Sequence, residues 1–510
     1  MTNKKQIILS IVANTLAMLV GTGINFFLTP FLTRTVGVAA YGFVPLASNF
    51  VSYVAIITTA FNSMGSRFIT VELHAGQKNR ANEYFSTIFF MNLGLAAITS
   101  IIFTILLLFL ENLINIPGEI ETDIKVLFTI SFASAVFSLI TNVYATATFC
   151  KNRLDLKSVI SIVGTIVRTA LLLALFFLLP AKVYYISIAN IAMNIAEGVC
   201  NFAVYKRIMG ELTVNRKDFR LGHIRSLLAS GIWNSVSQLS SILMTGLDLL
   251  VANIYINATE SGILSISKVM PGLLYTGVAL IVTAFGPQFV IDYAKEDGNK
   301  TMLSTMEYSA KLISFLTVIP VGGFLAFGID FFELWVPEQN SRVLFSLAAL
   351  TMLGDAVSYP IKTFDNVFAA VNKLRWPAIA TLICGLLNVA LMIPLLKYTP
   401  WGLYAVAGTS TFLLAGKDLF FKIPYLSRIA GCNVGTMWGH IFRYAVAAVA
   451  IVGISMLTKY FIPVNNWIVL IIDAVITSIL GVLVNYFIIF DKNSRKSVLL
   501  QTKNALARFQ

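Results

Sequence analysis

The sequence predicts an all-α integral membrane protein that crosses the bilayer with about fourteen helices, and three observations lead to this fold class. Of the 510 residues, 57% are hydrophobic and only 12% are charged, and the mean hydropathy is +0.81. This composition is more apolar and less charged than that of typical soluble domains. Apolar runs recur along the whole chain, each near or above the ~20 residues that a helix needs to cross ~30 Å of hydrocarbon. The basic residues gather in alternate loops.

The first apolar run, 7–32, follows Lys4 and Lys5, and basic residues before an apolar run are also a feature of cleaved secretory signals. The run is too long for a signal and has no small-residue cleavage site, so we expect a first membrane helix. Five further helices are expected in the first half, at 42–66, 81–110, 126–148, 156–179 and 183–205. The second half repeats this pattern at 224–256, 261–293, 302–328, 343–370, 377–396 and 402–425, and two last helices follow at 441–457 and 467–490.

The distribution of basic residues predicts the orientation in the membrane. Most of the 37 Lys and Arg residues, Lys417 and Lys422 included, fall in loops on one side. The opposite side carries only Arg34, Lys125, Lys182, Arg342, Lys397 and Lys459. By the positive-inside rule, both termini are cytoplasmic in a multi-pass protein of the cell membrane. Because topology explains the net charge of +13, we expect no binding of nucleic acid.

The polar connections predict the domain organisation. The longest of them divides the chain between the sixth and seventh expected helices. We expect an N-terminal lobe at 1–210, a cytoplasmic linker at 211–223, a C-terminal lobe at 224–430, two peripheral helices at 431–490 and a cytoplasmic tail at 491–510. The tail has the pattern of an amphipathic helix on anionic lipid, and a partly ordered basic tail is the alternative.

A weak internal similarity links the two halves. The turn at 35–48, TVGVAAYGFVPLAS, aligns with 255–268, YINATESGILSISK, so that Gly42 falls on Gly262. Few residues are identical, but both turns lie between the first two helices of a lobe. The pattern favours a parallel repeat without establishing a duplication.

The chain lacks the motifs of common catalytic and cofactor sites. It contains no phosphate-binding G-x-x-x-x-G-K-[ST] loop, no G-x-S-x-G nucleophile elbow and no HExxH pair. Its four cysteines show no CxxC spacing. We therefore expect no enzyme activity, no ATP-driven transport on this chain, no metal site and no resident cofactor.

Ionisable residues inside the expected helices are the candidate functional groups, because each costs at least ~2.5 to 3.5 kcal/mol at a helix centre unless it faces a polar interior. Arg168 and Glu197 lie near the middle of the fifth and sixth helices. Since their depths are similar, a structural ion pair and a substrate role both remain open.

The tenth expected helix carries a polar stripe. Asp355, Tyr359, Lys362 and Asn366 follow i, i+4, i+7, i+11 spacing and would share one face. Asp365 lies three residues from Lys362 and would neutralise it in a local salt bridge. Cavity lining and this salt bridge are the two interpretations.

Asp248 and Lys268 lie on the first hairpin of the second half. Lys268 supplies a cation for an anionic substrate group, and an intramembrane aspartate such as Asp248 or Asp355 is suited to bind a coupling Na⁺ or H⁺. The alternative for Asp248 and Lys268 is a pair across the hairpin. Arg34, at the end of the first hairpin, would either attract phosphate or cap its helix.

The same segments resemble a known family. The run LTPFLTRTVGVAAYGFVPLA at 28–47 is similar to the opening hairpin of Wzx-type polysaccharide flippases, of the multidrug/oligosaccharidyl-lipid/polysaccharide exporter superfamily. GLDLLVANIYINATESGILSISK at 246–268 resembles the second-lobe counterpart, and 372–411 resembles the late helices.

The resemblance implies two six-helix lobes around a central cavity, two peripheral helices, and alternating access. It also implies a substrate, an undecaprenyl-diphosphate-linked oligosaccharide that moves from the inner to the outer leaflet as a repeat unit of a surface polysaccharide. The implied partners are this substrate, membrane lipids and polysaccharide assembly machinery, with the chain as a monomer. Arg168, Lys268 and Lys362 fit the cationic cavity of such flippases, while Asp355, Asp365 and Glu197 dilute it.

Three other functions remain open at this point. A multidrug efflux antiporter of the same superfamily would have an acidic, aromatic-lined cavity, for which Asp248 and Asp355 are candidates. A membrane glycan polymerase would need catalytic groups that the short outer loops do not offer. An assembly scaffold is the third alternative.

Overall fold

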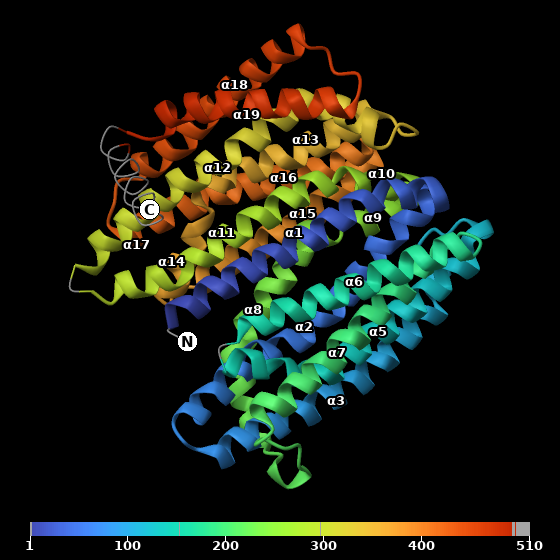
Figure 1. Ribbon diagram of the computed structural model, residues 1–510, viewed down its shortest axis with the longest axis vertical. Coiled ribbons are helices and arrows are strands. Elements are labelled where there is room, and N and C mark those ends of the chain that lie inside the picture. Colours follow the sequence, from blue (N-terminus) through green and yellow to red (C-terminus); the bar gives the residue numbers. More distant parts are fainter. Residues whose placement is uncertain (1–2, 152, 296, 492–494, 496–510) are drawn as a thin grey trace. The chain divides into compact units, whose positions relative to one another are not determined.

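The computed structural model describes residues 3–151, 153–295, 297–491 and 495, and the regular elements of this part of the chain are all helical (Figure 1). A helix satisfies its own backbone hydrogen bonds, which hydrocarbon cannot do, and this explains why the long apolar runs form helices. The chain divides into two compact units, Met1–Ile266 and Ser267–Gln510. Each unit is described by itself.

The first unit contains the helices up to residue 266. They are α1 (Asn3–Val36), α2 (Val38–His74), α3 (Lys78–Leu108), α4 (Leu110–Leu113), η1 (Gly118–Ile120), α5 (Glu121–Cys150), α6 (Leu154–Leu178), α7 (Tyr185–Met209), η2 (Arg216–Asp218), α8 (Leu221–Ser241), η3 (Ile242–Gly246), α9 (Asp248–Tyr255) and most of α10 (Ala258–Ser267). Within it α5 packs on α3 and α7, α6 on α1 and α7, and α2 on α8. Phe85 and Tyr205 stack in its core with ring centroids 5.3 Å apart.

The second unit contains the remaining helices. They are α11 (Val269–Tyr293), α12 (Gly298–Trp335), α13 (Ser341–Ser358), η4 (Tyr359–Phe364), α14 (Asp365–Ala370), α15 (Arg375–Tyr398), α16 (Leu403–Lys417), η5 (Asp418–Lys422), α17 (Ile423–Ala430), α18 (Val434–Phe461) and α19 (Trp467–Ile489). Here α12 packs on α18 and α19, and α16 packs on α13 and α15. Phe289, Met306, Phe364 and Leu426 are buried together in its core.

The helices confirm the predicted all-α polytopic fold. Within the described residues, ten helices are long and apolar enough to cross a membrane, or eleven if one bent pair counts as a single span. Every apolar run expected from the sequence corresponds to described helix, including the runs at 42–66 and 402–425.

Several of the expected continuous helices are interrupted, among them the runs at 224–256, 261–293, 343–370 and 402–425. In the run at 224–256, α8 is followed by the π turn η3 and then by α9, with a bend of 42° at the break. The run at 343–370 narrows into the 3-10 segment η4, where Pro360 removes a backbone donor. The stripe predicted on one regular helix from Asp355 to Asn366 is therefore wrong in its geometry, because its last three members lie beyond the end of α13.

The two glycines that align between the halves touch each other inside the first unit. A Cβ atom added to Gly42 would lie 2.7 Å from the Gly262 Cα atom, and one added to Gly262 would overlap the Val38 carbonyl oxygen. Only glycine permits this backbone contact between α2 and α10.

The packing also differs from the domain organisation expected above. Residues 224–266, which we assigned to the C-terminal lobe, belong to the first compact unit, where α8 packs along α2. The lobe boundaries themselves stay a prediction. Of the expected tail at 491–510, all but Asp491 and Arg495 lie outside the described residues.

Candidate functional site

A polar cavity of about 650 Å³ lies inside the first unit. Its polar lining consists of hydroxyl and amide side chains and one guanidinium: Ser48, Thr58, Thr99, Ser131, Ser134, Ser138, Asn142, Arg168, Asn190 and Asn194. Among the described residues that line it there is no carboxylate, and Phe103 is its one aromatic ring. Because hydroxyls and carboxamides both donate and accept hydrogen bonds, the wall suits a neutral, hydroxyl-rich ligand.

The cavity is lined by α2, α3, α5, α6 and α7, and α5 and α7 supply most of its residues. Ser134 and Ser138 of α5 lie one turn apart, as do Asn190 and Asn194 of α7. The Asn194 amide donates to the Ser134 hydroxyl at 2.6 Å. Small polar residues let membrane helices approach closely and hydrogen-bond across the interface. The contact between α5 and α7 thus also orients the groups that line the cavity.

Arg168 is the cation of this cavity. It projects from α6 and donates through Nη1 to the Asn25 side-chain oxygen of α1, 2.9 Å away. Its Nε atom is buried and has no hydrogen-bond partner within the described part of the chain. Nor does any described carboxylate form an ion pair with it. A guanidinium in a membrane helix without a carboxylate partner keeps its positive field and is suited to an anionic ligand group.

A second cavity of about 350 Å³ continues from the first, since both are lined by Ser138, Asn142 and Asn194. Glu197 and Lys157 line the second cavity. The Arg168–Glu197 pair that the sequence left open is absent from the described structure, because Arg168 bonds to Asn25 and Glu197 packs against Gly164. The two cavities together form a polar interior, with Arg168 in the first and Lys157 and Glu197 in the second.

Asp248 is fully buried where the span of α8 and α9 is broken. The preceding π turn leaves the Gly246 carbonyl available, and it accepts hydrogen bonds from the Asn49 amide at 3.1 Å and the Tyr53 hydroxyl at 2.7 Å. Tyr53 also lies within electrostatic reach of Asp248. The break is therefore held by α2, and Asp248 occupies the first turn of α9, where the helix dipole favours a carboxylate.

The second unit holds a network of charges. Lys422 Nζ lies 2.7 Å from Asp365 Oδ1, and Lys362 Nζ lies 3.6 Å from Asp365 Oδ2. Lys362 also lies over the Tyr275 ring, 5.4 Å from its centroid. Asp365 thus forms ion pairs with both lysines. The Lys362–Asp365 salt bridge, which was one of the two interpretations of the sequence, is therefore part of a larger network.

Several predicted site residues meet in this unit. Asp355 lies within electrostatic reach of Lys362 and Lys268, and Tyr359 within reach of Asp355. Asn366 instead donates to the Val282 carbonyl at 2.7 Å, which ties α14 to α11. Arg34 is exposed at the end of α1 in the first unit.

Sequence reasoning misplaced two lysines and gave no role to the buried acids Asp418 and Asp473. Lys417 and Lys422, which we assigned to a basic loop, belong to the helical run of α16 and η5, and Lys422 is only 4% exposed. The i, i+4 spacing of Asp418 and Lys422 inside an apolar run was the available signal. Asp473 of α19, which received no role, is fully buried, and neither of its carboxylate oxygens is hydrogen-bonded within the described residues.

Comparison with known proteins identifies the family. The family model described as polysaccharide biosynthesis protein matches residues 7–291, more than half of the chain. This chain belongs to the polysaccharide biosynthesis protein family. The family assignment agrees with the resemblance seen in the opening hairpin, which lies inside the matched range.

Relatives extend the similarity over nearly the full length. The uncharacterized membrane protein EpsK of Bacillus subtilis (strain 168) is 27% identical over 501 residues, which cover 96% of each chain. The lipid II flippase MurJ in an inward closed conformation shares the fold with a TM-score of 0.68 at 17% identity, over 94% of this chain and 98% of MurJ. An inward-facing multidrug resistance MATE transporter gives a TM-score of 0.69 at 15% identity, over 82% and 98%. These similarities show that this chain shares the fold of both structures.

Proposed function

We propose that this chain is a flippase that moves an undecaprenyl-diphosphate-linked oligosaccharide from the inner to the outer leaflet by alternating access. The polysaccharide biosynthesis family and the shared superfamily fold support a membrane transporter of this kind. The observation that carries the choice of substrate is the wall of the first cavity, where hydroxyls and amides surround one arginine. Sugars need the first kind of group and a diphosphate needs the second.

The physical need for such a path is large. Each sugar hydroxyl or phosphate oxygen that enters hydrocarbon without a hydrogen bond costs several kcal/mol. A polar interior in the first unit replaces the lost water. An inside-negative potential favours outward movement of the anionic headgroup by ~2.3 kcal/mol per charge per 100 mV.

The same wall argues against export of organic cations. A cation carrier needs carboxylates or aromatic faces to stabilise its substrate. The described lining of the first cavity offers one phenylalanine, a cation and no carboxylate, and the Glu197 carboxylate of the second cavity shares its lining with Lys157. Shared fold with a multidrug transporter does not alter this chemistry.

Arg168 provides the decisive test. We expect Arg168→Gln to lower translocation by about tenfold or more, because a hydrogen bond to a charged group contributes ~1.5 to 3 kcal/mol. The measurement is the fraction of lipid-linked oligosaccharide that an external periodate or glycosidase reaches in vesicles. Arg168→Lys keeps the charge and should retain part of the activity.

The matched control is Arg207→Gln, which removes one exposed cation from α7 of the same unit. It should translocate like the unmodified protein. If Arg168→Gln also flips normally at equal expression, or if it impairs export of an organic cation instead, the flippase proposal is wrong.

A further inference from the structure

The connection between α7 and α8 is fixed along the first turns of α3. The Ser86 hydroxyl donates to the Thr213 carbonyl and accepts from the Asn215 backbone N–H, both at 3.1 Å. The Arg220 backbone N–H donates to the Thr87 hydroxyl at 3.1 Å. Side chains of α3 thus form hydrogen bonds with backbone groups of this connection. The segment that we expected to be a linker is therefore fixed against α3.

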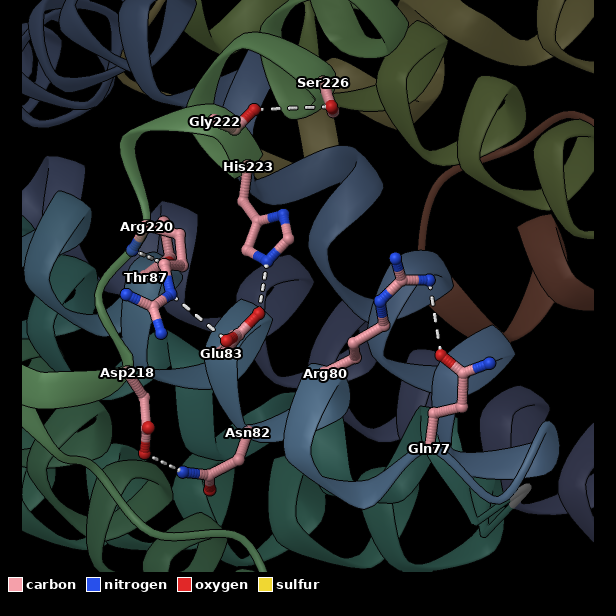
Figure 2. Close-up of polar contacts among 10 residues, drawn as sticks. All are labelled: Gln77, Arg80, Asn82, Glu83, Thr87, Asp218, Arg220, Gly222, His223 and Ser226. Carbon is pink, nitrogen blue, oxygen red and sulfur yellow. Dashed lines mark hydrogen bonds and ion pairs between the residues drawn. The ribbon is translucent and has the colours of Figure 1, made fainter.

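The acids of this region are already occupied. Figure 2 shows Glu83 accepting from Arg220 Nε at 3.1 Å and paired with His223 Nε2 at 3.0 Å, while the Asn82 amide donates to Asp218. Arg216 lies in the same short turn as Asp218 and is exposed. No described carboxylate forms an ion pair with Arg216, so its charge is available at the surface.

Arg216 stands at one end of an apolar groove of about 460 Å³. The groove is lined by Phe90, Met91, Gly94, Leu95, Ile98, Arg216 and Phe219, so the guanidinium is its one charged group. The residues of α3 follow i, i+1, i+4, i+5, i+8 spacing and form one helix face. A Cβ atom added to Gly94 would meet no atom within 4 Å, which shows that the glycine opens the groove.

Exposed apolar side chains extend this face along the membrane span. Ile98, Ile101 and Ile105 are 53%, 62% and 51% exposed, and they continue along α3 away from Arg216. A cation at one end and a long hydrocarbon-like surface beyond it match the two parts of a phospholipid. Basic sites beside membrane helices bind anionic headgroups, and arginine pairs with phosphate through two parallel hydrogen bonds.

We propose that this groove binds an anionic phospholipid, with one acyl chain along α3 and the headgroup phosphate on Arg216. The ligand is a resident lipid, distinct from the transported substrate and from the cavity at Arg168. Arg216 favours a headgroup with net negative charge over a zwitterionic one, because Glu83 and Asp218 are engaged elsewhere. The docked connection holds Arg216 in position over the groove.

The test measures lipid that stays bound to the purified full-length protein. The protein is reconstituted in vesicles of phosphatidylglycerol and phosphatidylcholine, extracted in mild detergent, and analysed for retained lipid by mass spectrometry. We expect selective retention of phosphatidylglycerol. Arg216→Gln should lower this retention about fivefold, since a basic residue near the membrane surface contributes ~1 kcal/mol.

Gly94→Leu provides an independent variant, because the added side chain fills the groove and leaves Arg216 in place. Leucine also favours a helix more than glycine does, so the variant should fold. Lys217→Gln removes a neighbouring exposed charge, and Ala97→Leu adds the same bulk to an exposed position of α3 outside the groove. Both controls should retain phosphatidylglycerol like the unmodified protein.

Three results would overturn the proposal. Retention could stay unchanged in both Arg216→Gln and Gly94→Leu, or phosphatidylcholine could be retained equally well. Retention could also fall for Arg216→Gln and Lys217→Gln alike but not for Gly94→Leu, which would indicate diffuse surface charge. Adding polyprenyl phosphate to the vesicles distinguishes a resident phospholipid from the transported lipid. If polyprenyl phosphate displaces phosphatidylglycerol from the groove, the site belongs to the transported lipid.

Discussion

At the scale of single residues, Asp248 and Arg168 illustrate two ways to keep a charge inside the first unit. Asp248 is fully buried at a broken span whose Gly246 carbonyl is held by α2. Arg168 borders a cavity and bonds to a neutral amide. The acid is enclosed by protein, whereas the arginine faces space that a ligand can occupy. Their chemistry assigns them different tasks in the proposed cycle.

We propose Asp248 as the group that binds a coupling Na⁺ or H⁺. Asp248→Asn keeps the size of the side chain and removes its charge, so translocation should fall by about tenfold, the rate effect of a change of about 1.4 kcal/mol. The residual rate should no longer respond to an imposed Na⁺ or pH gradient. The measurement is oligosaccharide translocation in vesicles with and without each gradient, with Asp248→Glu as the charge-conserving control. If Asp355→Asn removes the gradient response and Asp248→Asn does not, the ion site lies in the second unit.

At the scale of elements, Glu211 in the connection after α7 links that helix to α3 and α5 through ion pairs. Glu211 pairs with Lys78 at the start of α3, at 2.8 Å, and with Lys151 after α5, at 3.0 Å. These hydrogen bonds, the one from Lys78 foremost, hold the pKa of Glu211 below its ordinary value. The carboxylate form therefore ties the connection to both helices.

Replacing Glu211 tests this contact through its pH dependence. Because the pKa of Glu211 is lower in the folded protein, its carboxylate stabilises the fold at pH values above the ordinary glutamate pKa of ~4.3. This contribution disappears as the pH falls through the lowered pKa of the folded state. Glu211→Gln should lower stability by about 0.5 kcal/mol at pH 7, because the groups are largely exposed. Thermal midpoints in detergent should then converge with those of the unmodified protein near pH 3. Glu119→Gln, at an exposed acid of η1, should not show this pH-dependent difference in thermal midpoint. If Glu211→Gln lowers the thermal midpoint equally at pH 7 and pH 3, Glu211 does not stabilise the fold through these ion pairs.

At the scale of the whole molecule, the alternation of basic loops predicts its orientation. Lys217 and Glu119 lie beyond opposite ends of α3, since η2 docks at its first turns and η1 follows its end. We propose that the Lys217 side and both termini are cytoplasmic. In a variant without native cysteines, Glu119→Cys should react with an impermeant maleimide in intact cells. Lys217→Cys should react only after permeabilisation, and the opposite pattern would reverse the orientation.

The sequence predicted the membrane fold because hydrocarbon imposes it on any long apolar run. Helix breaks were beyond this reasoning, since the π turn at Ile242–Gly246 depends on contacts that Asn49 and Tyr53 make from another helix. The cavity was in part predictable. Arg168 was expected from its cost in lipid, and Ser134, Ser138 and Asn142 repeat at helical spacing, but a search for charges passes over neutral polar stripes.

The contact between Gly42 and Gly262 has a consequence for the two similar turns of the chain. In a two-fold symmetric dimer, a self-complementary patch places the same residue on both sides of the interface. Here equivalent glycines of two similar turns face each other within one polypeptide. The parallel repeat that the sequence pattern favours thus meets at a point where both copies of the turn require glycine, so a side chain added to either copy would push α2 and α10 apart.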